Sequence, residues 1–71
     1  MIHFTKYAEE KFDLLNKYKV YFTREQVEDA VKLPEKTGKK NGYLTARKDG
    51  IKVIYKREGN VIKIITFFPI K

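Results

Sequence analysis

The fold of this 71-residue chain is decided by three segments, Gly42-Tyr-Leu-Thr-Ala-Arg-Lys48, Ile51-Lys-Val-Ile-Tyr-Lys-Arg-Glu58 and Val61-Ile-Lys-Ile-Ile-Thr-Phe-Phe68. Each has the length and the content of β-branched and aromatic residues that are typical of a strand. The dipeptides Asp49-Gly50 and Gly59-Asn60 separate them. Gly and Asn accept the positive φ that two-residue hairpin turns require. The stretch therefore predicts an antiparallel three-stranded meander.

Two-residue turns fix the pairing register and assign each side chain to a face of the sheet. With Lys48 opposite Ile51 and Glu58 opposite Val61, we expect a core face formed by Leu44, Ala46, Lys48, Ile51, Val53, Tyr55, Arg57, Ile62, Ile64, Thr66 and Phe68. We expect an open face formed by Tyr43, Thr45, Arg47, Lys52, Ile54, Lys56, Lys63, Ile65 and Phe67. A three-residue turn at Asp49-Gly50 would exchange the two faces of the first strand.

The expected open face alternates cations with aromatic and apolar groups. A sheet face of this kind suits a polyanion with bases that can stack, such as single-stranded RNA. A plain solvated face, whose lysines limit aggregation, explains the same composition equally well. The pattern alone leaves both interpretations open.

The charge distribution favours a phosphate-binding surface. The chain has a net charge of +7, and residues 36 to 57 carry eight cations against one anion. Residues 1 to 35 carry six cations against seven anions. Segregation of this kind is the electrostatic pattern expected of a nucleic-acid-binding protein. A composition selected by a hot environment would explain many lysines, but not their concentration in one segment.

Composition also limits the classes of protein to which the chain can belong. There is no cysteine, so disulfides and thiolate metal sites are excluded, and His3 is the one histidine. We expect no metal and no cofactor. The apolar runs are short and interrupted by lysines, and the start of the chain lacks a signal-peptide pattern. We therefore expect a cytoplasmic protein that forms one domain over residues 1–71.

The first half of the chain predicts a short strand and two helices. Ile2 and Phe4 alternate in the expected strand, and Thr5 can cap the helix that follows. That helix has a core stripe at Ala8, Phe12 and Leu15.

The second helix has a clearer start signal. Thr23-Arg-Glu-Gln26 is a capping box, so the helix begins at Arg24, and Pro34 ends it near Lys32 or Leu33. The next segment, Lys36 to Gly42, is basic and lacks the spacing of a phosphate-binding loop. We expect a mobile basic loop beside the sheet, or a plain flexible connector.

The predicted order of strand, helix, helix and three strands resembles the RelE/ParE superfamily of toxin–antitoxin ribonucleases. It is most similar to a BrnT-like branch of small toxin-like domains. Three segments carry that closer resemblance, namely Tyr7-Ala-Glu-Glu-Lys11, Phe22-Thr-Arg-Glu-Gln-Val-Glu-Asp-Ala-Val-Lys-Leu-Pro34 and Ile65-Thr-Phe-Phe-Pro69. Gly50-Ile-Lys-Val-Ile-Tyr55 resembles a stretch of RelE in which a functional arginine stands at the place of Lys52.

The resemblance implies an α+β fold, β-α-α-β-β-β, with two helices packed on one face of an antiparallel sheet and RNA on the other. It implies cleavage by attack of a ribose 2′-hydroxyl on the adjacent phosphate, with cations stabilising the phosphorane. Lys52 and Arg47 would be the catalytic residues. The expected nucleic-acid-binding residues are Tyr43, Lys56, Lys63, Phe67, Lys39 and Lys40.

The chain also departs from the family pattern. Tyr43 and Thr45 stand where the second strand of RelE-like toxins carries lysines, and the sequence ends at Lys71, before the segment that holds a catalytic tyrosine in those toxins. We therefore expect RNA binding to persist more readily than cleavage.

Three hypotheses follow from the sequence. The chain is a toxin-like endoribonuclease, acting alone or with the ribosome, or it is a non-catalytic nucleic-acid-binding protein that uses the same face. As a third alternative, it is a protein-interaction module. In that case Ile54, Ile65 and Phe67 would be covered by an acidic antitoxin or by a second copy in a homodimer.

Overall fold

The computed structural model describes residues Met1–Ile70, which form two helices and five strands. Their bounds are β1 (Ile2–Phe4), α1 (Lys6–Lys17), α2 (Arg24–Lys32), β2 (Lys36–Lys40), β3 (Tyr43–Lys48), β4 (Ile51–Glu58) and β5 (Val61–Pro69). The strands make one sheet in the order β1-β5-β4-β3-β2. β1 is parallel to β5, and the other neighbouring pairs are antiparallel. Among the described residues there is no helix long and apolar enough to span a membrane.

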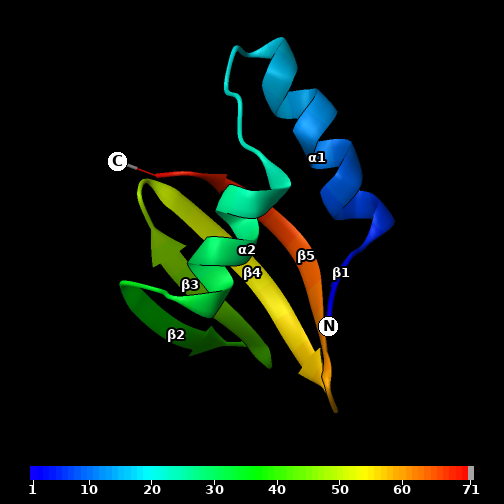
Figure 1. The fold of residues 1–71 in the computed structure, drawn as a ribbon, viewed down its shortest axis with the longest axis vertical. Coiled ribbons are helices and arrows are strands. Elements are labelled where there is room, and N and C mark those ends of the chain that lie inside the picture. Colours follow the sequence, from blue (N-terminus) through cyan, green and yellow to red (C-terminus); the bar gives the residue numbers. More distant parts are fainter. Residues whose placement is uncertain (71) are drawn as a thin grey trace.

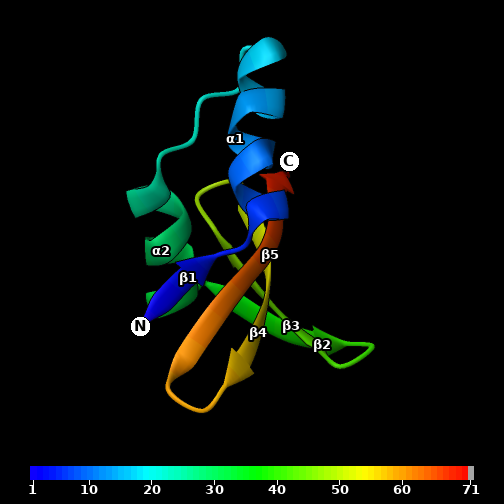
Figure 2. The same cartoon turned by 90° about the vertical axis from the view of Figure 1, so that its right-hand side faces the viewer.

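Both helices cover the same face of the sheet, and its other face is left without a covering helix (Figures 1 and 2). α1 packs over β5 and β1, and α2 packs over β3 and β4. The buried side chains between these layers form the core, which contains Ala8, Leu15, Val27, Ala30, Val31, Ala46, Ile51, Val53, Ile64 and Phe67. The predicted α+β fold with two helices on one face of the sheet is confirmed.

Local hydrogen bonds start both helices where the sequence predicts. The Thr5 hydroxyl accepts a hydrogen bond from the Ala8 backbone N–H at 3.2 Å. The Thr23 hydroxyl accepts one from the Gln26 N–H at 3.1 Å, and the Gln26 side-chain oxygen accepts one from the Thr23 N–H at 2.9 Å. The capping box is therefore complete, and α2 ends at Lys32, before Pro34.

The two predicted hairpin turns are also present. Lys48 pairs with Ile51 across Asp49 and Gly50, which have φ values of 51° and 80°. Positive φ at both central positions is the pattern of a type I′ turn. Glu58 pairs with Val61, and Gly59 has a φ of 60° at the first turn position. The face assignment of β3 and β4 therefore holds.

The prediction of a loop from Lys36 to Gly42 is wrong. Residues Lys36–Lys40 form the edge strand β2, which pairs with β3 along its full length. Asn41 and Gly42 make a third two-residue turn, with φ values of 52° and 83°. Asn-Gly is itself one of the strongest hairpin signals. The lysines of this segment are therefore held on a strand.

The predicted faces of β5 are wrong beyond Ile64. Tyr55 pairs with Ile64, but Ile54 pairs with Thr66, so Ile65 is the extra residue of a β-bulge. One extra residue exchanges the two faces for the rest of the strand. Phe67 consequently lies in the core, with 0% of its surface exposed, and its ring centroid is 4.6 Å from that of Phe12.

Candidate nucleic-acid interface

Two rows of cationic and aromatic side chains cross the open face of the sheet, and a row of small and apolar residues lies between them. The register places Lys36 opposite Arg47, Arg47 opposite Lys52, and Lys52 opposite Phe68. We call these four residues the Arg47 row. Because β2, β3, β4 and β5 each contribute one member, the sheet holds the row in a line perpendicular to its strands.

The second row, which we call the Tyr43 row, contains Lys40, Tyr43, Lys56 and Lys63. Lys40 pairs with Tyr43, and Lys56 pairs with Lys63. The Lys56 ammonium lies 5.7 Å from the centre of the Tyr43 ring, which joins the two halves of the row. Tyr43 and Arg47 are four residues apart on β3. Since residues two apart on a strand are about 6.6 Å apart, the two rows lie about 13 Å from each other.

The row between them has mostly short side chains. It contains Gly38, Thr45, Ile54 and Thr66. A Cβ atom added to Gly38 would lie 2.9 Å from the Thr45 Oγ1, so the side chain of Thr45 occupies the space that a larger residue at position 38 would need. A hollow of about 240 Å³ opens here and is lined by Lys40, Asn41, Tyr43, Thr45, Lys52 and Ile54.

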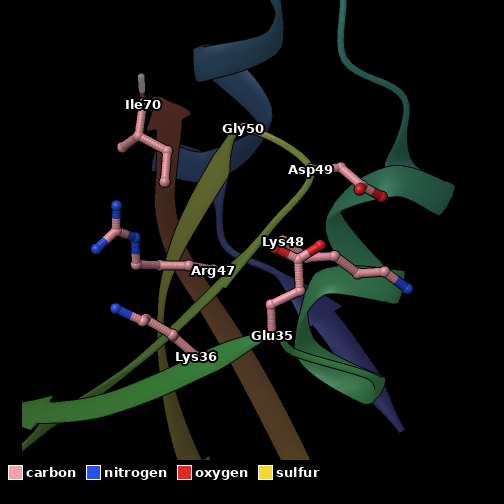
Figure 3. Close-up of a pocket in the computed structure, with 7 residues that line it drawn as sticks. All are labelled: Glu35, Lys36, Arg47, Lys48, Asp49, Gly50 and Ile70. Carbon is pink, nitrogen blue, oxygen red and sulfur yellow. The ribbon is translucent and has the colours of Figure 1, made fainter.

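The cations of the Arg47 row are free to bind an anion. Figure 3 shows the side chains of Lys36 and Arg47 extending on the same side of the sheet, while Lys48 extends the other way, toward α2. Lys48 forms an ion pair with Asp29 at 4.0 Å. No carboxylate of residues 1–70 forms an ion pair with Lys36, Arg47 or Lys52. These three charges are therefore not neutralised within the described chain.

Aromatic rings lie beside the cations in both rows. The Lys52 ammonium is 5.9 Å from the centre of the Phe68 ring, and Tyr43 is an exposed aromatic residue. Lys63 is 3.1 Å from the Glu58 carboxylate, so its charge is partly compensated. Each row therefore offers one ring for stacking and two or more cations. This combination can hold phosphates and unpaired bases together.

A larger hollow of about 340 Å³ lies at the end of the sheet where the Arg47 row meets the turn between β3 and β4 (Figure 3). Its lining residues are Glu35, Lys36, Arg47, Lys48, Asp49, Gly50 and Ile70. Glu35 precedes β2, and its backbone N–H donates a hydrogen bond to the Arg47 carbonyl at 2.8 Å. This contact fixes the start of β2, and with it Lys36, next to Arg47.

Six of the eight predicted site residues lie together on the open face. They are Arg47, Lys52, Tyr43, Lys56, Lys63 and Lys40. Phe67 does not lie there, because the bulge at Ile65 turns its ring into the core. Lys39 pairs with Leu44 and so lies on the side of the sheet that the helices cover, at the exposed edge.

Two residues of the rows, Lys36 and Phe68, are not among the predicted site residues. The signal in the sequence for Lys36 is the Asn41-Gly42 dipeptide, because a hairpin turn there places Lys36 opposite Arg47. Phe68 takes the outward place that had been predicted for Phe67. No dipeptide in β5 marks the bulge that exchanges them.

The cations of this face can act on a phosphodiester through their charge. Among residues 1–70 there is no group of three or more His, Asp or Glu side chains arranged to hold a metal ion. His3 pairs with Lys63 and extends the Tyr43 row by one place. Several cations with fixed spacing can bind a phosphodiester and stabilise the additional negative charge of a phosphorane.

Comparison with known proteins bears on the fold. No protein-family model matches the sequence, and no curated protein matches it. Among solved structures, a chain in the crystal structure of the toxin–antitoxin complex RelBE2 from Mycobacterium tuberculosis is similar, with a TM-score of 0.60 and 14% sequence identity. The similarity covers 97% of this chain and 95% of that chain. This protein has a RelE-like toxin fold.

This similarity confirms the fold that the broader of the two resemblances implies. The similarity to BrnT toxins stays a prediction. At 14% identity the likeness concerns the course of the backbone. What the RelE-like fold does in this protein has to be argued from its own side chains.

Proposed function

We propose that this protein is the toxin-like member of a toxin–antitoxin pair in the cytoplasm, and that it binds single-stranded RNA across the open face of its sheet. The observation that carries the proposal is the presence of the Arg47 row and the Tyr43 row on the uncovered face of a RelE-like fold. Each row combines cations with an aromatic ring, as expected of a surface that binds backbone phosphates and unpaired bases.

The two rows have different roles in this proposal. Lys36, Arg47 and Lys52 bind the phosphate at which cleavage takes place, because their charges are not neutralised by carboxylates of residues 1–70. Lys40 and Lys56 bind a neighbouring phosphate. Unpaired bases stack on the rings that accompany each row, which are those of Tyr43 and Phe68.

Cleavage follows from the same arrangement without a metal ion. The ribose 2′-oxygen forms a bond with phosphorus while its proton passes to water, and the 5′-oxygen leaves and takes up a proton. The products are a 2′,3′-cyclic phosphate and a 5′-hydroxyl. Arg47 and Lys52 would stabilise the phosphorane, whose negative charge is greater than that of the starting diester.

An acidic antitoxin is the protein partner that the charge of the chain favours. The net charge is +7, and the excess lies in residues 36 to 57. An acidic segment that covered the Arg47 row would compete directly with RNA. Loss of RNA binding in such a complex is the expected sign of this partner.

The test is incubation of the purified protein with labelled single-stranded RNA, alone and with ribosomes. We would compare it with the double variant Arg47→Ala/Lys52→Ala. The matched control is Lys39→Ala/Arg57→Ala, which removes the same two residue types from exposed positions on the other side of the sheet. Retention on a gel reports binding, and analysis of the RNA ends reports cleavage.

We expect the control to bind RNA like the unmodified protein and the Arg47/Lys52 variant to lose both retention and cyclic phosphate ends. Binding without cleavage would identify a non-catalytic RNA-binding protein. If the unmodified protein shows neither binding nor cleavage at low salt, with and without ribosomes, the proposal is wrong and a protein-interaction module is the remaining hypothesis.

A further inference from the structure

The outer flank of α1 is an apolar stripe that nothing in residues 1–70 covers. Tyr7, Leu14 and Tyr18 are 61%, 45% and 73% exposed. They lie beside the core stripe of the helix, on the side that faces away from α2. The opposite side of α1 faces α2, and there Glu9 forms an ion pair with Arg24 of α2. Figure 2, turned by 90° from Figure 1, shows α1 toward the viewer. The exposed fractions show that the three side chains of the stripe face solvent.

The spacing of this stripe is that of a coiled-coil seam. Tyr7, Lys11, Leu14 and Tyr18 follow one another in steps of four, three and four residues. This is the spacing of the a and d positions of a heptad, which face a partner helix. The residues that face the sheet, Ala8, Phe12 and Leu15, belong to a separate stripe. α1 thus has one apolar stripe for the core of its own chain. Its second stripe, in which Lys11 lies between Tyr7 and Leu14, has no partner within residues 1–70.

The surface of α1 is hollowed at this stripe. A hollow of about 230 Å³ is lined by Tyr7, Glu10, Lys11 and Leu14. These positions are i, i+3, i+4 and i+7, the kind of four-residue group on a helix surface that receives one knob in knobs-into-holes packing. Tyr18 lies one turn beyond the hole on the same stripe and is a large exposed side chain. The stripe therefore carries both a hole and a knob.

We propose that the outer flank of α1 pairs with the same flank of a second copy of this chain, as an antiparallel helix pair around a two-fold axis beside Leu14. Tyr18 of each copy then enters the hole of the other. Leu14 contacts the partner's Leu14. A two-fold arrangement of this kind is self-complementary, because every contact occurs twice.

Charge complementarity favours a second copy over an acidic protein at this flank. In the antiparallel pair Glu10 lies beside the partner's Lys17, and Lys17 lies beside the partner's Glu10. Residues 1 to 35 carry six cations against seven anions, so two copies can meet there without bringing their basic segments together. An acidic partner would instead be attracted to residues 36 to 57, which carry eight cations against one anion.

The dimer leaves the open face of each sheet free. α1 lies on the opposite side of the sheet from the Arg47 row and the Tyr43 row (Figures 1 and 2). The pairing therefore neither requires nor prevents RNA binding. It can be tested without RNA.

The first test uses the absence of native cysteine from the chain. Facing Cα atoms of two packed helices lie about 5 Å apart when the axes are about 10 Å apart, which a disulfide can bridge. Leu14→Cys should therefore form a disulfide-linked dimer under mild oxidation. The matched control is Leu33→Cys, since Leu33 is 66% exposed and lies outside α1.

The second test is sedimentation velocity over a range of protein concentrations. We expect a monomer–dimer equilibrium, at least tenfold weaker in Glu10→Lys and in Lys17→Glu. The double variant Glu10→Lys/Lys17→Glu should recover the dimer, because the exchanged charges again face each other. Both positions are exposed, so far-ultraviolet circular dichroism should show all three variants folded.

The proposal is overturned if the protein stays monomeric at millimolar concentration, or if Leu14→Cys crosslinks no faster than Leu33→Cys. A dimer that both single charge variants leave unchanged would also contradict it, since it would have to form through another surface. Crosslinking of Leu14→Cys to an added acidic protein in preference to itself would assign the flank to a different occupant.

Discussion

Phe67 and Phe68 are adjacent in the sequence and face opposite sides of the sheet. Phe67 pairs with Val53 and packs against Phe12 and Phe22 in the core. Phe68 pairs with Lys52 on the open face. The difference comes from the bulge at Ile65, since an extra residue in one strand exchanges its faces from that point onward.

The two phenylalanines should therefore respond differently to truncation. We expect Phe67→Ala to lower the free energy of unfolding by about 3–5 kcal/mol, because it leaves a cavity in the core. This is a large share of the stability of a small domain. Phe68→Ala should change it by less than about 1 kcal/mol and should weaken RNA binding. Urea denaturation followed by circular dichroism measures the first effect, and a binding titration measures the second. The opposite ranking of the two stabilities would show that the bulge is absent in solution.

At the scale of elements, short local signals define where helices and hairpins begin. The Thr23 and Gln26 side chains complete the capping box of α2, and three turn dipeptides set the register of four strands. Both kinds of signal act over a few residues. They can therefore be recognised without knowledge of the rest of the fold.

The capping box makes a measurable contribution to stability. Thr23→Ala should lower the free energy of unfolding by about 1 kcal/mol, because the Gln26 N–H loses the hydroxyl that accepts its hydrogen bond. Thr23→Ser retains an acceptor and should stay within a few tenths of a kcal/mol of the unmodified protein. The midpoints of urea denaturation compare the two. Equal loss in both variants would mean that the methyl group of Thr23, and not its hydroxyl, is what matters.

The turn between β2 and β3 connects stability with the proposed function. Gly42 has a φ of 83° and no atom within 4 Å of the position of an added Cβ, so Gly42→Ala introduces backbone strain without a side-chain clash. We expect a loss of about 1–2 kcal/mol. We also expect weaker RNA binding, because β2 supplies Lys36 and Lys40 to the two rows.

Asn41→Gly is the control for this turn. Asn41 also has a positive φ, of 52°, which glycine adopts without strain. The variant should keep both its stability and its affinity for RNA. A loss of RNA binding in Asn41→Gly as large as that in Gly42→Ala would indicate that the Asn41 side chain itself contacts the ligand.

The features of this fold that the sequence predicts depend on residues that are neighbours in the chain, and the features that it does not predict depend on contacts between distant segments. The capping box and the turns at Asp49-Gly50 and Gly59-Asn60 were found because each depends on residues that are neighbours in sequence. The Asn41-Gly42 hairpin has the same kind of local signal, although the basic composition of Lys36 to Gly42 favours a loop. The bulge could not be found in this way, because it is decided by how β5 fits against β4 and α1 at once.

The candidate site follows the same division. Arg47, Lys52, Tyr43 and Lys56 can be assigned to one face because they lie on the two strands that the predicted turn at Asp49-Gly50 joins. Phe67 could not, because it lies beyond the bulge. The alignment of Lys36 with Arg47 depends on the hairpin that joins β2 and β3, and the Asn41-Gly42 dipeptide is its signal in the sequence.

At the scale of the whole molecule, the open face should behave as a polyelectrolyte ligand. Neutralisation of about four phosphates on a single strand predicts a slope of about −3 for the logarithm of the binding constant against the logarithm of the salt concentration. Titrations at several salt concentrations measure it. The Arg47→Ala/Lys52→Ala variant should reduce the slope by about 1.4, and Lys39→Ala/Arg57→Ala should leave it unchanged. Equal reductions in both variants would mean that binding responds to net charge and not to the open face.

β1 forms one edge of the sheet. It pairs in parallel with β5, with Ile2 opposite Ile62 and Phe4 opposite Ile64. Contacts between such distant residues form late, because the intervening chain has to lose its freedom before the contact can form. During synthesis, β1 leaves the ribosome before β5, its only partner strand within residues 1–70. The hairpins that carry the Arg47 row can form among themselves without β1. β1 is therefore made before the three-stranded meander but joins the sheet after it. Ile2 and Phe4 stay unpaired in the nascent chain until β5 has been made.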